Sequence, residues 1–207
     1  MQSTHLVHKH LLAIFLLIWP IHSFAENTGA VTVVEEFHKT LIDVMKNAEK
    51  LGFQGRYDIL APVIESKFDT PLIAQVILSR YWSELNEEQQ KQFIQLFNRL
   101  SISTYASRFN SYANESFKTS GTEELKKGRL LIKTEFIKTD DKPVKFDYMV
   151  HQNGENWYII SVIANGVNDV ALKRAEYAAI INDRGFNSLV SELEAKINEL
   201  SSSSDNI

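Results

Sequence analysis

The sequence has no cysteine among its 207 residues. A chain without cysteine forms no disulfide, carries no thiolate nucleophile, builds no cysteine-ligated metal site and offers no cysteine to a lipid anchor. Its stability must therefore come from a hydrophobic core. A hydrophobic content of 44% over this length suits one globular domain.

The sequence also lacks the short motifs of several enzyme classes. It contains no G-x-S-x-G nucleophile elbow, and Gly166 stands alone in the turn "NGVND", which excludes a glycine-rich phosphate loop. Four of the six histidines lie within the first 25 residues. His38 and His151 lack the spacing of a shared metal site, and we expect them at the surface or in a capping role. We expect no metal, no cofactor and no catalytic set.

An excess of positive charge and a long apolar run are also missing. The formal net charge is −4, which argues against nucleic acid as a partner. The apolar run Leu11–Pro20 is too short for a membrane span, which needs roughly 20 residues. Because Lys9 precedes this run and the small residues Ser23 and Ala25 follow it, we predict a signal peptide over 1–25 that is cleaved after Ala25. The mature chain would be a single domain over 26–200 with a disordered tail over 201–207.

Helical periodicity dominates the first half of the chain. Apolar residues at three-four spacing predict a helix from Ala30 to Leu51, which Gly52 ends. Shorter helices are predicted over 54–66 and 71–79, the second capped by Asp69 or Thr70. Asn86 and Gln89 form a capping-box pattern that should begin a long helix ending near Tyr112.

The period then changes to the alternation of strands. Strands are predicted over 128–138, 143–152 and 156–164, with a weaker one over 116–122, and short turns make the sheet antiparallel. Two more helices follow, over about 168–183 and from a cap at Ser188. The fold class is α+β, with a twisted antiparallel sheet of about four strands packed against several helices. One parity of the strands is apolar and should face the helices: Leu130, Ile132, Phe136, Val144, Phe146, Tyr148, Val150, Trp157, Ile159 and Ile163.

The junction between the last strand and the next helix raises the question of a cavity. Asn165-Gly166 predicts a tight reversal with a structural role. The helix after it is rich in small residues, and we expect them to face the large apolar residues of the sheet: Ala171, Ala175, Ala178 and Ala179. Such an arrangement either lets helix and sheet approach closely or leaves an apolar cavity, and the residues leave both open.

An ordered set of motifs extends from about Val31 to Ile197. It comprises Phe68-Asp69, Trp82, Gln89-Gln90, Phe93, Phe97, Tyr105, Trp157, Gly166-Val167, Arg174, Gly185 and Leu189. This set resembles the MlaC and toluene-tolerance auxiliary proteins of lipid-transport ABC systems. The segment "DVALKRAEY" is similar to the hopanoid-associated branch of that family. Two positions depart from the family pattern: Ser161 stands where an acidic residue is frequent, and Asn168 where a serine is usual.

The resemblance implies a soluble periplasmic carrier that maintains the outer membrane. Its sheet and helices would enclose the acyl chains of a phospholipid or a hopanoid- or sterol-like lipid, leaving the head group outside. Its partners would be a membrane-bound ABC transporter and an outer-membrane lipoprotein complex. We expect the lipid-binding wall to comprise Phe37, Leu41, Phe97, Ile132, Phe136, Phe146, Tyr148, Ile159 and Ala175.

Two other function classes remain open at this stage. A small cone-shaped α+β enzyme, such as an isomerase or dehydratase, could use Asp147 or Asp69 together with Tyr148 in an apolar pocket. Otherwise we interpret Asp69 as a helix cap and Asp147 as a solvent-facing strand residue. The third class is an adaptor that contacts an ABC permease without carrying cargo.

Overall fold

The computed structural model describes residues 23–139 and 141–203. Most of the predicted signal peptide and the last four residues therefore lie outside the described residues. Of the predicted tail, Ser201–Ser203 belongs to the last helix. Within the described ranges the elements follow one another as α1 (Ser23–Lys46), α2 (Ala48–Lys67), α3 (Thr70–Leu78), the 3-10 helix η1 (Ser79–Glu84), α4 (Glu87–Arg108), β1 (Ser116–Leu125), β2 (Arg129–Ile137), β3 (Val144–Asn153), β4 (Asn156–Ala164), β5 (Val167–Asn168), α5 (Asp169–Arg184) and α6 (Phe186–Ser203).

The strands form one five-stranded antiparallel sheet with the order β1-β2-β3-β4-β5. This arrangement confirms the predicted fold class. The fifth strand was not expected: Asn165 and Gly166, with φ of 48° and 83°, make a two-residue hairpin, so that Ala164 pairs with Val167. Positive φ at both central residues gives a turn whose twist matches that of the strands.

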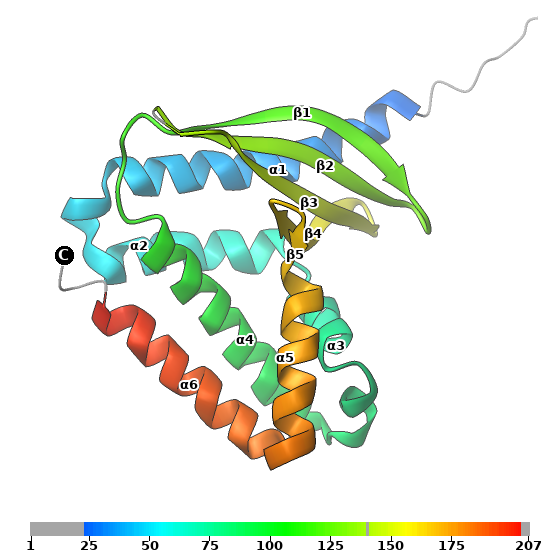
Figure 1. Ribbon diagram of the computed structural model, residues 1–207. Helices are drawn as coiled ribbons and strands as arrows, with labels where there is room; N and C mark the ends of the chain where they lie inside the picture. Colours follow the sequence, from blue (N-terminus) through cyan, green and yellow to red (C-terminus); the bar gives the residue numbers. More distant parts are fainter. Residues whose placement is uncertain (1–22, 140, 204–207) are drawn as a thin grey trace, which may run out of the picture.

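The helices all lie on one side of the sheet (Figure 1). Helix α1 runs across the sheet and contacts all four long strands. It comes closest at Gly29, where an added Cβ would lie 2.9 Å from Cδ1 of Trp157. Helices α2, α4, α5 and α6 form a second layer below it, with α3 beside α5. None of the helices in the described ranges is both long and apolar enough to cross a bilayer.

Two of the predicted caps are present, whereas Ser188 lies inside α6 and does not begin it. The Asp69 carboxylate accepts a hydrogen bond from the Leu72 amide at 3.0 Å and starts α3. Asn86 and Gln89 form the expected capping box at the start of α4. Gly52 does not end a helix as predicted. Its φ of 60° produces a kink inside α2, and α1 has already ended at Lys46.

A β-bulge in β4 changes which residues face the helices. Val150 pairs with Ile159, but the next partners are Met149 and Ser161, so Ile160 is an extra residue. One extra residue exchanges the two faces of a strand beyond it. Val162, opposite Tyr148, therefore joins the core in place of the predicted Ile163, which is only half-buried.

The alanines of α5 do not face the sheet. Ala171, Ala175 and Ala179 are exposed, and Ala178 is half-buried. The buried side of α5 carries its larger apolar residues, Val170, Tyr177 and Ile180. Burying these residues removes far more apolar area from water than burying alanine methyl groups would, and this difference sets the rotation of the helix.

The buried residues form two separate hydrophobic clusters. The first, which we call the sheet core, joins the sheet to α1, α2 and the end of α4. The second, the helix core, lies among α3, α4, α5 and α6 with Ile160 of β4. Phe68 packs against both clusters, and the Asp69 amide, next to it, donates to the Ile159 carbonyl oxygen at 3.1 Å. This segment fastens the helical layer to β4.

Candidate functional site

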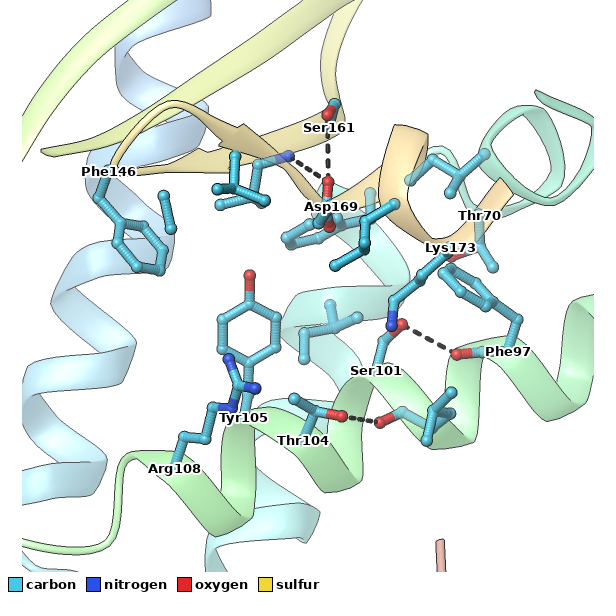
Figure 2. A pocket seen from close by; sticks show the side chains of 18 of the residues that line it. Thr70, Phe97, Ser101, Thr104, Tyr105, Arg108, Phe146, Ser161, Asp169 and Lys173 are labelled. Carbon is cyan, nitrogen blue, oxygen red and sulfur yellow. Dashed lines mark hydrogen bonds between the residues drawn. The ribbon is translucent and has the colours of Figure 1, made fainter. Parts of the chain in front are cut away.

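A pocket of about 260 Å³ lies where the two cores meet. Its floor is α4 and its roof is formed by β4, β5 and the start of α5 (Figure 2). It is lined by Ile64, Phe68, Thr70, Ile73, Phe97, Leu100, Ser101, Thr104, Tyr105, Arg108, Phe109, Phe146, Ser161, Val162, Ala164, Val167, Asp169, Leu172 and Lys173.

The inner wall of the pocket is apolar and comes from both cores. Phe146 and Val162 belong to or pack on the sheet core, whereas Phe97 and Leu100 belong to the helix core. Ligand pockets usually occupy about 300 to 1,000 Å³, and an apolar cavity of roughly 150 Å³ already binds benzene. The pocket therefore suits a segment of one hydrocarbon chain, and a larger guest requires the two cores to move apart.

Tyr105 of α4 directs its hydroxyl group into this space (Figure 2). Burial raises the pKa of Tyr105, so the phenol stays neutral and can donate or accept a hydrogen bond. Its ring packs edge-on against Phe37, with the centroids 5.0 Å apart. Phe37 in turn contacts Tyr148, which is 0% exposed and whose hydroxyl has no hydrogen-bond partner among the described residues. The wall behind Tyr105 is thus aromatic, with one unsatisfied polar atom.

Asp169, the first residue of α5, brings a half-buried carboxylate to the roof. Its Oδ1 accepts hydrogen bonds from Ser161 Oγ at 3.1 Å, the Val162 amide at 2.9 Å and the Val170 amide at 2.7 Å. Burial raises the pKa of this carboxyl group, and these donors together with Lys173 oppose the shift. These bonds hold the start of α5 against β4. Ser161, which departs from the family pattern, is the partner of this acid, and Asn168 caps α5 by accepting from the Ala171 amide.

The rim of the pocket combines exposed apolar residues with two cations. Val167 and Leu172 are 56% and 59% exposed. Arg108, in the last turn of α4, and Lys173 of α5 complete the lining on the helical side (Figure 2). An apolar interior with a charged rim is the arrangement that an amphipathic molecule requires.

The residues predicted as the lipid-binding wall fall into three groups. Phe97 and Phe146 line the pocket. Most of the others are buried in the sheet core behind it: Phe37, Leu41, Ile132, Phe136, Tyr148 and Ile159. Ala175 is exposed and does not line this pocket, because α5 turns its larger residues inward.

Several lining residues were not selected from the sequence. Thr104, Arg108, Asp169 and Lys173 belong to polar positions of helices, where solvent exposure is the usual interpretation. One feature of the sequence could have indicated a role for Asp169: it is an acidic residue directly after a predicted strand and at the start of a predicted helix.

The two histidines outside the predicted signal peptide are not simple surface residues. His38 is 5% exposed and stacks on Phe117 with the ring centroids 3.8 Å apart, so the surface expectation was wrong. Burial lowers its pKa to about 3. His151 Nε2 lies 2.8 Å from Asp69 Oδ2, beside the cap of α3.

The carboxylates considered for catalysis are both engaged in other contacts. Asp69 is occupied by the Leu72 amide and His151. Asp147 is half-buried rather than solvent-facing, and accepts from the Thr134 amide at 3.1 Å, where it joins β3 to β2. Neither residue lines the pocket. Over the residues that the structure describes, no group of three or more His, Cys, Asp or Glu side chains could hold a metal ion.

Two comparisons with known proteins bear on this site. A family model described as MlaC protein matches residues 35–195. Among solved structures, a phospholipid-binding protein from Ralstonia solanacearum in complex with a phospholipid is 21% identical in sequence. The match covers 83% of this chain and 98% of that chain with a TM-score of 0.74. At this identity the likeness establishes the fold.

Proposed function

Because this chain belongs to the MlaC protein family, we propose that it is a periplasmic lipid carrier that shelters acyl chains in the pocket between the two cores. The observation that carries the proposal is the position of an apolar pocket with a charged rim at the junction of two separately packed clusters. Export by the predicted signal peptide over 1–25 belongs to the same proposal.

Phospholipid is the cargo that we propose first. The similar protein from Ralstonia solanacearum is described as phospholipid-binding, and a charged rim suits a lipid with a polar head. A hopanoid- or sterol-like lipid is the second candidate, supported by the resemblance of "DVALKRAEY" to the hopanoid-associated branch. The proposed partners are a membrane-bound ABC transporter and an outer-membrane lipoprotein complex, between which the carrier would exchange its cargo.

The driving force for loading is the removal of acyl chain from water. Each buried methylene contributes roughly 0.8 kcal/mol, so even a short segment repays the separation of a few aromatic side chains. We propose that a chain enters beside Phe97 and Phe146 and displaces Tyr105 from Phe37. The predicted wall residues behind Tyr105 would then contact the chain: Phe37, Leu41, Ile132, Phe136, Tyr148 and Ile159.

Lipid extraction from purified protein tests this proposal. We expect organic extraction and mass spectrometry to recover lipid from the wild-type protein. Ala164→Phe should lower the recovered lipid severalfold, because Ala164 lines the pocket and the added ring would fill it. Ala175→Phe is the matched control: the same substitution on the exposed side of α5 should leave the recovery unchanged.

The same experiment separates the carrier from the other two function classes. An adaptor without cargo would yield no lipid from any of the three proteins. An enzyme would also yield lipid-free protein. Its activity would depend on the carboxylates Asp69 and Asp147 and not on whether the pocket is filled. Equal recovery from Ala164→Phe and wild type would remove this pocket from the proposal.

A further inference from the structure

Tyr148 is a tyrosine at a position where the fold buries the whole side chain. It lies on β3 and is 0% exposed, and its hydroxyl group has no hydrogen-bond partner among the described residues. A buried hydroxyl group without a partner destabilises a folded protein, and native structures seldom contain one. Phenylalanine would fill nearly the same space without this penalty. The hydroxyl group of Tyr148 therefore indicates a polar partner that the described residues do not supply.

The Tyr148 side chain lies directly behind the wall of the apolar pocket. Its cross-strand partner is Val162 on β4, so both side chains point to the same face of the sheet. Val162 lines the pocket, and its amide donates to the Asp169 carboxylate at 2.9 Å. The ring of Phe146, another lining residue, lies 5.9 Å from the Tyr148 ring between centroids. A guest in the pocket is thus separated from Tyr148 by a single layer of side chains.

Tyr105 brings a second phenolic hydroxyl group to the same place. This group points into the pocket, toward the roof that carries Asp169 (Figure 2). The rings of Tyr105 and Tyr148 both pack edge-on against Phe37, with centroid distances of 5.0 and 6.3 Å. Burial, and then the neighbouring Tyr105 and Asp169, raise the pKa of Tyr148, so its hydroxyl group stays neutral. In the proposed loading Tyr105 leaves Phe37, and the guest then contacts Tyr148 as well.

Asp169 adds a hydrogen-bond acceptor to these two hydroxyl groups. The three hydrogen bonds that it accepts all reach Oδ1, so Oδ2 is available to a guest. None of the ion pairs among the described residues involves Asp169 or Lys173. Two other hydroxyl groups of the pocket are already engaged, because Ser101 and Thr104 donate to backbone carbonyls of α4 at 2.9 and 2.7 Å.

We propose that Tyr105, Tyr148 and Asp169 form a binding site for an alcohol hydroxyl group on the part of a lipid that enters the pocket. The assignment rests on the proposed carrier function and specifies its cargo as a lipid with a hydroxylated acyl chain. A hydroxyl group both donates and accepts, so it can donate to Asp169 Oδ2 and accept from a tyrosine. An ester carbonyl only accepts, and a plain hydrocarbon chain satisfies none of the three groups. Nothing in this contact depends on chain length or on double bonds.

All three residues also have structural roles that the test must separate from binding. The two tyrosine rings pack against Phe37, and Asp169 holds the start of α5 against β4. Replacing a tyrosine by phenylalanine keeps the ring and removes the hydroxyl group alone. The readout has to be a ratio between two guests, because a change in packing affects both guests alike.

A competition between fatty acids that differ by one hydroxyl group isolates the contact. Lipid-free protein is incubated with equal amounts of palmitic acid and a hydroxypalmitic acid, isolated again, extracted and analysed by mass spectrometry. The hydroxyl group is placed in turn near the carboxyl end, in mid-chain and at the far end. We expect wild-type protein to retain at least one hydroxylated acid over palmitic acid by about fivefold or more. The carboxyl group is common to all guests, so its contacts with the rim cancel in the ratio.

Three variants assign the preference to the site. Tyr148→Phe and Tyr105→Phe should each lower the ratio severalfold. The double variant should prefer palmitic acid, because burying a hydroxyl group without a partner is unfavourable. Tyr177→Phe is the matched control: Tyr177 is a 2% exposed tyrosine of the helix core that does not line the pocket, and its variant should keep the wild-type ratio. If Tyr148→Phe does not fold, Tyr105→Phe answers the question alone.

Urea unfolding of the lipid-free protein gives a second readout for Tyr148. Because Tyr148→Phe removes a hydroxyl group without a partner, the unfolding midpoint should rise or stay unchanged while the preference for the hydroxylated guest falls. A hydroxyl group with a purely structural role would give the opposite result. A clear fall of the midpoint would show that the hydroxyl group is bonded in the lipid-free protein and would overturn its assignment to a guest.

The outcomes distinguish the failure of this site from the failure of the carrier proposal. Equal retention of palmitic acid and every hydroxylated acid overturns the hydroxyl site and leaves the carrier intact. The same holds for phenylalanine variants that keep the wild-type ratio. Wild-type protein that retains none of these chains overturns the carrier, and the hydroxyl site with it.

Discussion

At the scale of single residues, His38 shows how a polar residue can be hidden on an apolar helix face. It lies four positions after Val34 and three before Leu41, both fully buried on α1. That spacing places it on the buried stripe of the helix. Its ring stacks on Phe117, and its Nε2 has no hydrogen-bond partner among the described residues. Helical periodicity could have predicted that His38 is buried. We expected it at the surface because histidine more often lies there.

The burial of His38 predicts acid sensitivity. Above pH 6.5 the residue is neutral in both states and its contribution to stability is complete. Below pH 6.5 His38 is protonated in the unfolded chain, whereas in the folded chain it stays neutral down to its pKa of about 3. The free energy of unfolding therefore falls as the pH is lowered through that interval. We expect wild-type protein to lose about 2 kcal/mol more than His38→Phe between pH 7 and pH 5. Urea unfolding at the two pH values measures this difference, and parallel losses would contradict the buried neutral state.

The lining residues show what single positions reveal about a pocket. Phe97 and Phe146 were predicted as wall residues because large apolar side chains on a helix and on a strand are expected to pack together, and both line the pocket. Arg108 and Lys173 were not, because nothing in their spacing distinguishes a cation at a pocket rim from one in solvent. Ala175 was selected for its small size, which indicates close packing only if the helix turns that side inward.

At the scale of elements, the sequence predicted the strands and helices well and the irregularities poorly. Alternating residues located β2, β3 and β4 to within a residue or two. The bulge at Ile160 was not predicted, because it depends on how β4 pairs with β3 and not on the sequence of β4 alone. Helix α4 ends at Arg108, earlier than the predicted Tyr112, and an irregular segment over 109–115 leads into β1.

The cap of α3 carries a prediction at this scale. Asp69 accepts from the Leu72 amide and contacts His151, so it joins the helix to β3. We expect Asp69→Ala to lower the free energy of unfolding by about 1 to 2 kcal/mol. Asp69→Asn should cost less, because an amide oxygen can still cap the helix. Urea unfolding at neutral pH measures both variants.

Asp43→Ala is the control for this pair. Asp43 is an exposed residue of α1, and its removal should leave the free energy of unfolding nearly unchanged. If Asp69→Asn proves as damaging as Asp69→Ala, the contact with His151 and not the cap provides the stability.

At the scale of the whole molecule, the fold class followed from a change of hydrophobic period along the chain. Three-four spacing before about residue 112 and alternation after it separate the helices from the sheet. The pocket could not be derived in this way, because it is a space left between two surfaces and depends on how α5 and the β4 bulge are rotated. Of the predicted wall residues, Phe97 and Phe146 line the pocket, and its position appears only in the structure.

Hydrogen exchange tests whether the two cores behave as separate bodies. We expect lipid loading to slow amide exchange most in the second half of α4 and in the segment from β4 to the start of α5, which line the pocket. The amides between β2 and β3, inside the sheet core, should change little. Equal slowing throughout the protein would indicate that loading stabilises one cooperative unit.

Phe68 packs on both clusters, which share no buried residue within the described part of the chain. In the proposed loading the two clusters move apart about this contact as Tyr105 leaves Phe37. A pocket that widens in this way would bind saturated and unsaturated acyl chains of different lengths with similar affinity. We therefore expect the lengths and double bonds of the bound acyl chains to mirror those of whichever bilayer supplied them.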